Sequence, residues 1–280
     1  MFEEILGIVV ETAKISLLVM VMMIIVDLLN VITRKKLRTF FREKKKLVQY
    51  ISASFIGALP GCIGGFTNVS LYVHGVISFG ALAGSMMAVS GDEAFVMLAM
   101  FPQEAVILFV ILFFIGVAGS YVIDYAVIKF QIKTCDNCTE MVVHEHSHGV
   151  KHYIKEHIWA HIIKKHVIRT SLWTFGALLI VHFGLKYFDL TSFTSEYKIV
   201  FLFLGALVGL IPESGPHLIF VTLFAQGLVP FSVLLTSSIV QDGHGMLPML
   251  SYSFKDALKI KLFNFSIGLI LGLILFLAGF

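Results

Sequence analysis

Ionisable residues interrupt an otherwise apolar stretch of the chain, residues 209–248. Glu213 and His217 are four positions apart and would share one face of a helix. Asp242 and His244 flank Gly243, where the backbone can bend sharply. Carboxylates and imidazoles together suit divalent metals such as Mn²⁺, Fe²⁺, Zn²⁺ and Ni²⁺. The stretch therefore predicts a metal site.

An earlier stretch, residues 57–97, repeats this pattern 152 positions upstream. Glycines and prolines recur at this offset: Gly57, Pro60, Gly75 and Gly91 match Gly209, Pro212, Gly227 and Gly243. Asp92 takes the position of His244, and Cys62 stands one position from the counterpart of Glu213. We therefore expect one metal site to which each of the two stretches contributes ligands. Its candidate ligands are Cys62, Asn68, Asp92, Glu93, Glu213, His217, Asp242 and His244. Alternatively, some of these groups pair only with one another or with nearby Ser and Thr.

The composition is that of a polytopic membrane protein. Of the 280 residues, 58% are hydrophobic and 14% are charged, whereas about a quarter of the residues in a soluble domain are charged. A spanning helix needs about 20 apolar residues, so the chain has room for about ten crossings. The apolar runs are continuous, which predicts an all-α fold.

Charged residues between the apolar runs predict the topology. A basic cluster at residues 34–46 favours a cytoplasmic loop over a nucleic-acid patch, and Lys255, Lys259 and Lys261 are expected on the same side. Both termini would then lie outside. The predicted spans are 5–32, 47–64, 67–88, 93–101, 105–128, 167–188, 197–211, 217–238, 246–254 and 257–280, of which the short 93–101 and 246–254 either span or re-enter.

The chain divides into a first membrane unit (1–128), a polar loop (129–166) and a second membrane unit (167–280). The flanking charges give the two units opposite orientations. We therefore predict an inverted five-plus-five repeat with broken helices, the arrangement by which secondary transporters alternate access to a midplane site.

Other polar residues in apolar segments are candidates for a coupling or ion pathway. Asp27 and His182 are counterparts at an offset of 155. Asp27 and Asp124 lie near the predicted cytoplasmic face. An equal alternative to a pathway role is therefore that their side chains simply extend to the water at that face. His74 is either a ligand or a satisfied structural group. The set comprises Asp27, His74, Asp124, His182 and Gln241.

The polar loop is rich in histidine and cysteine. Cys135 and Cys138 form a C-x-x-C pair next to a histidine tract, a composition typical of metal binding. The expected ligands are Cys135, Cys138, His144, His146, His148, His157 and His161. The alternative is a solvated loop whose histidines have no function. Residues 144–148 match H-E-x-x-H, but Ser147 and Gly149 argue against the helix that a zinc protease requires.

Two long segments carry a family resemblance: GALPGCIGGFTNVSLYVHGVISFGALAGSMMAVSGDEAFVMLAMFP and GLIPESGPHLIFVTLFAQGLVPFSVLLTSSIVQDGHGMLPML. They resemble the ten-transmembrane heavy-metal exporters, also known as manganese transporters or ArsP-like efflux proteins. The opening segment ETAKISLLVMVMMIIVDLLNVI is similar to the first helix of that family. The resemblance implies a multi-pass transporter of the prokaryotic inner membrane, working as an exporter.

The residues and the resemblance together predict a secondary transporter, not an enzyme. No G-x-x-x-x-G-K-[ST] motif for ATP is present, so protons or the membrane potential would drive it. The expected substrate is Mn²⁺ or Fe²⁺, with Zn²⁺ as a further candidate. The expected partners are the lipid bilayer and metal ions, without nucleic acid, and a homo-oligomer remains open. One alternative is an efflux permease for an arsenical or other small solute, although trivalent arsenic favours thiolates and only Cys62 lies in the membrane. Others are an intramembrane metalloenzyme and a metal sensor.

Overall fold

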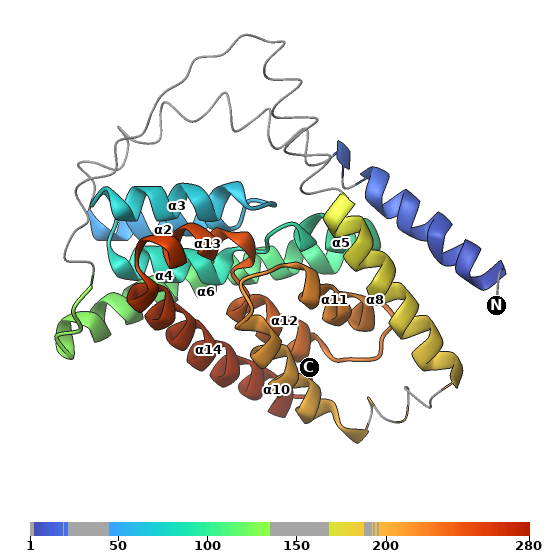
Figure 1. Ribbon diagram of the computed structural model, residues 1–280. Coiled ribbons are helices and arrows are strands. Elements are labelled where there is room, and N and C mark those ends of the chain that lie inside the picture. The colour runs from blue at the N-terminus through green and yellow to red at the C-terminus, as the bar shows by residue number, and fades with distance from the viewer. Residues whose placement is uncertain are drawn as a thin grey trace, which may run out of the picture.

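The computed structural model describes residues 3–18, 20–21, 45–134, 168–187, 192, 194 and 196–280 (Figure 1). Every regular element among them is a helix, which confirms the all-α prediction. Residues 3–18 form an N-terminal helix. The other helices of the first membrane unit are α2 (Lys46–Gly57), α3 (Ile63–Val73), α4 (Phe79–Ala88), α5 (Glu93–Met100) and α6 (Pro102–Lys129). Asp27 and the predicted ligands at 135–161 lie outside the described residues.

Helices α2 and α3 form an antiparallel hairpin. The Asn68 side chain donates to the Ala53 carbonyl, and a Cβ on Gly64 would lie 2.1 Å from the Ile56 carbonyl oxygen. At 12 residues, α2 is about 18 Å long, too short to cross a hydrocarbon core of about 30 Å. The predicted span 47–64 therefore ends early, because Pro60 lacks an N–H and Gly61 has φ +98.

Helices α4 and α5 follow one another along the long helix α6. Residues 89–92 interrupt them, and Gly91 has φ +57. Small residues allow α4 to lie close to α6: a Cβ on Gly84 would meet the Ser120 Oγ at 2.1 Å and the Gly116 carbonyl at 2.3 Å. The result is a broken helix packed against a continuous one.

The second membrane unit has the same order of elements after α8 (Ile168–Tyr187). These elements are α10 (Lys198–Gly209), η2 (Gly215–His217), α11 (Leu218–Ala225), α12 (Phe231–Val240), η3 (Gly243–Gly245), α13 (Met246–Tyr252) and α14 (Phe254–Leu277). Helices α10, α12 and α14 each begin 152 positions after α2, α4 and α6. Gly227 and Gly243, with φ +68 and +51, match Gly75 and Gly91, with φ +67 and +57.

Two described helices, α6 and α14, are long and apolar enough to cross a membrane. Helices α4, α10 and α11 are shorter, because loops interrupt the apolar segments to which they belong, and the apolar part of α8 is Ser171–Gly184. The predicted count of ten crossings therefore remains a prediction. The interruptions matter for function, because they bring polar residues to the centre of the molecule.

Candidate metal centre

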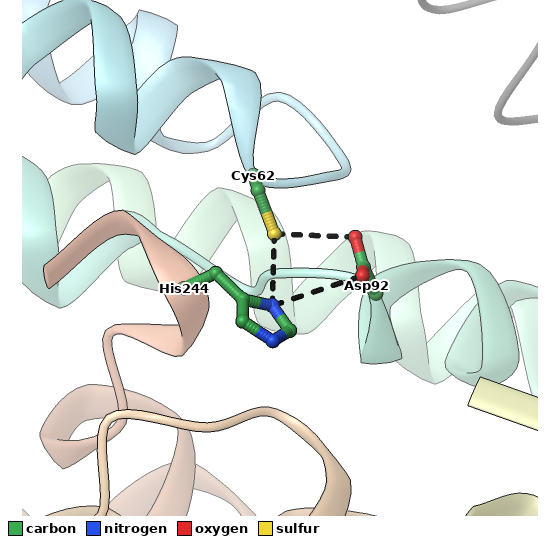
Figure 2. Close-up of side chains that lie close together, drawn as sticks. All are labelled: Cys62, Asp92 and His244. Atoms are coloured by element: carbon green, nitrogen blue, oxygen red, sulfur yellow. Dashed lines mark hydrogen bonds and ion pairs between the residues drawn. The ribbon is translucent and has the colours of Figure 1, made fainter. Parts of the chain in front are cut away.

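Three side chains from three interrupted segments meet at one point (Figure 2). Cys62 precedes α3 at the tip of the first hairpin, Asp92 precedes α5 at the break after α4, and His244 lies in η3. The Cys62 Sγ lies 3.2 Å from Asp92 Oδ1 and 3.4 Å from His244 Nδ1. Asp92 Oδ2 lies 3.9 Å from His244 Nδ1.

These separations suit a metal ion. A tetrahedral site with bonds of about 2.0–2.3 Å has ligands about 3.3–3.8 Å apart. The three donor atoms already lie near that spacing. Their residues are all buried, with exposed fractions of 4% for Cys62, 4% for Asp92 and 7% for His244. A thiol, a carboxylate and an imidazole can therefore hold one cation and leave further coordination positions open.

Glu213 completes the cluster from the far side of the imidazole. Its Oε1 lies 3.1 Å from His244 Nε2, whereas Cys62 and Asp92 face Nδ1. A carboxylate on the distal nitrogen fixes the orientation of a metal-binding histidine and raises its basicity. Glu213 is thus placed to orient His244 when Nδ1 binds the metal.

A small pocket adjoins the cluster. Asp92, Glu93, Glu213 and His244 line it, together with Trp173, Ser214, Gly215 and Leu218. The Glu93 side chain is buried, and its Oε2 has no hydrogen-bond partner among the described residues. Three carboxylates around one small pocket favour a positively charged occupant.

Glycines make this convergence possible. The Gly61 N–H donates to the Gly91 carbonyl over 3.0 Å, which ties the first hairpin tip to the break before α5. Gly91 and Gly243 both adopt left-handed φ angles, which glycine tolerates without strain. The backbone therefore brings Cys62 and Asp92 together directly.

The remaining predicted ligands lie elsewhere. Asp242 faces Lys261, with 2.5 Å between Oδ2 and Nζ, and accepts from Asn264 over 2.9 Å. His217 Nδ1 lies 3.1 Å from the Ser237 Oγ, and Asn68 bonds the Ala53 carbonyl within its own hairpin. These three residues have structural partners and do not face the Cys62–Asp92–His244 cluster.

The predicted pathway residues within the described part of the chain have separate partners. Asp124 accepts from the Tyr50 hydroxyl and the Gly80 N–H, both over 2.7 Å. Gln241 donates to the Val89 carbonyl, and the His74 Nδ1 lies 2.6 Å from the Ser70 carbonyl at the end of α3. His182 lies on α8 with its ring against Phe183.

One charged residue of this region, Lys261, does not lie where the flanking charges predict it. Lys261 was expected at the cytoplasmic face, but it is 7% exposed within α14 and contacts the break after α12. An ionisable residue seven positions inside a 24-residue apolar helix could have signalled this.

Comparison with characterised proteins and with solved structures found no match. A family model, in contrast, matches most of the chain, in two overlapping regions, residues 12–186 and 170–278. The chain therefore belongs to the ArsP_2 family, described as "Putative, 10TM heavy-metal exporter".

Proposed function

We propose that this chain is a secondary transporter that exports a divalent transition metal across the cytoplasmic membrane. The observation that carries the proposal is the buried meeting of Cys62, Asp92 and His244 in a member of a heavy-metal exporter family. A cation in this cluster would find a carboxylate, an imidazole and a thiol that can ionise. The open coordination positions suit a cargo that must leave again.

The thiol favours Fe²⁺ over Mn²⁺ as the cargo. Mn²⁺ prefers carboxylate, carbonyl and water ligands, whereas imidazole and thiolate suit iron and zinc. Cys62 Sγ lies within 3.4 Å of a donor atom of each of the other two ligands, so a metal bound by Asp92 and His244 would lie within reach of the thiol. Of the two expected cargoes we therefore place Fe²⁺ before Mn²⁺, and the same ligands suit Zn²⁺ equally.

The two units would form an inverted repeat around this cluster. Lys259, in the second turn of α14, donates to the carbonyl of Lys133, which follows α6. The end of α6 and the start of its counterpart α14 thus lie on one side, so the two helices would cross in opposite directions. Such a repeat provides two equivalent ways of opening a midplane site. Proton coupling is consistent with a cysteine and a histidine, which must lose protons when they bind metal.

A flux series in proteoliposomes tests the proposal. Purified protein is reconstituted, and uptake or release of Fe²⁺ (under anaerobic conditions), Mn²⁺, Zn²⁺ and arsenite is measured in parallel. We expect divalent-metal flux that is lost in Asp92→Asn and in His244→Gln. Glu104→Gln changes an exposed carboxylate at the start of α6 and should behave as wild type.

Arsenite flux that neither added metal nor either substitution affects would overturn the proposal in favour of an arsenical permease. Orientation is checked in the same vesicles by adding substrate to one side only.

A further inference from the structure

The buried ammonium group of Lys261 connects the two segments of the second membrane unit that carry Glu213 and His244. Lys261 Nζ lies 2.5 Å from Asp242 Oδ2 and donates to the carbonyls of Gly209, over 2.8 Å, and Val240, over 3.2 Å. The Asn264 amide donates to the other Asp242 oxygen over 2.9 Å. Lys261 therefore bonds to three oxygens from two separate points of the chain, Gly209 and the break at 240–242.

Two of these oxygens belong to helix ends. Gly209 is the last residue of α10, and Val240 is the last residue of α12. Carbonyls at the C-terminal end of a helix lack intrahelical partners and carry partial negative charge, so a cation there is stabilising. Glu213 lies in the loop that follows Gly209, between α10 and η2. His244 lies in the break that follows Val240, between α12 and α13. Lys261 thus ties together the two segments whose side chains meet at the imidazole.

The first unit makes the same connection without a side chain. There the Gly61 N–H donates to the Gly91 carbonyl. At an offset of 152 the counterpart of Gly61 is Glu213, but its N–H donates to Ile211 within its own tip. The counterpart of Lys261 is Phe109, which provides no cation. One unit therefore ties its tip to its break through backbone, and the other ties them through Lys261.

We propose that Lys261 is a positioning residue for metal binding: its ammonium keeps the Glu213 tip and the His244 break in register, so that Glu213 orients the imidazole toward the metal. This inference rests on the proposed function, because it concerns the same metal. It predicts that replacing Lys261 weakens metal binding through His244 and leaves Cys62 bound to the metal.

Cobalt binding by the purified full-length chain tests the inference. Co²⁺ reports a thiolate ligand by a charge-transfer band and the geometry of the whole site by its visible d–d absorption. Because Lys261→Met alone leaves the buried Asp242 carboxylate without its cation, the principal variant is Lys261→Met combined with Asp242→Asn. Size exclusion and thermal melting establish that it is folded. Lys259→Met is the matched control, since Lys259 lies on the same helix in an ion pair with Asp256.

In the folded double variant Glu213 should no longer orient His244, so we expect Co²⁺ to bind about 10- to 100-fold more weakly, the range for loss of an outer carboxylate from a metal-binding histidine. At saturation the thiolate band should persist while the d–d absorption changes, and Lys259→Met should match wild type. A double variant with wild-type affinity and spectrum would overturn the role of Lys261. A wild-type protein that binds no Co²⁺ would overturn the proposed function instead.

Discussion

Gly91 and Gly243 face each other at the centre of the molecule. A Cβ on Gly243 would lie 3.4 Å from the Gly91 Cα, and a Cβ on either glycine would lie within 2.7 Å of the Ser214 Oγ. The two glycines are counterparts at the offset of 152 and share left-handed backbones. Asp92 and His244 directly follow them. The close approach of the two breaks is therefore what brings a ligand from each unit to one metal.

Gly243→Ala is expected to disrupt the centre more than its backbone strain alone would. An alanine at φ +51 costs roughly 1–3 kcal/mol, and its methyl group also displaces the Ser214 side chain from its place between the breaks. Gly227→Ala is the matched control, because Gly227 has φ +68 but open space around it. Thermal melting should show a loss of stability in both variants, because both place alanine at a positive φ. Fe²⁺ flux should be lost only in Gly243→Ala. Equal flux in the two variants would contradict this account.

Sequence patterns predicted some parts of this arrangement and could not predict others. The offset of 152 pairs Asp92 with His244 from the sequence alone, because glycines and charges that interrupt apolar helices have few alternative explanations. The short hairpin of α2 and α3 is not predicted, because the apolar residues of 47–64 and 67–88 indicate two longer helices and hydropathy does not show where each helix ends. Asp242 is predicted as a metal ligand, but in the structure it pairs with Lys261, which is 19 residues away in the sequence, so the pair could not be predicted from local spacing.

The histidine-rich loop should bind metal independently of the buried cluster. We propose that Cys135, Cys138 and the loop histidines collect metal on the cytoplasmic side. Replacing them all with serine should lower the number of metal ions bound per chain and leave the affinity of the remaining tight site unchanged. Equilibrium dialysis with elemental analysis measures both quantities. Loss of the tight site in this variant would show that the loop and the cluster form a single site.

Cys62→Ser should change which metal is preferred. The hydroxyl is smaller and harder than the thiolate, so Zn²⁺ and Fe²⁺ lose their favoured ligand, while Mn²⁺ loses little. We expect affinity for Zn²⁺ and Fe²⁺ to fall by at least about tenfold relative to Mn²⁺, which corresponds to about 1.4 kcal/mol. Competition titrations with pairs of metals measure the ratio directly. An unchanged ratio would place Cys62 outside the coordination sphere, despite its 3.2 Å approach to Asp92.

Glu213→Gln separates an orienting role from direct ligation. If Glu213 accepts from His244 Nε2 while Nδ1 holds the metal, the variant keeps three ligands and loses only orientation and basicity. Metal affinity should then fall about 10- to 100-fold, whereas Asp92→Asn and His244→Gln should lose nearly all binding. The glutamine oxygen can still accept a hydrogen bond, so the pH below which metal dissociates should shift only slightly. Isothermal titration of the three variants over a pH series provides both comparisons. A loss in Glu213→Gln as complete as in His244→Gln would make Glu213 a metal ligand in its own right, with the cation held closer to the pocket that Glu93 and Glu213 line.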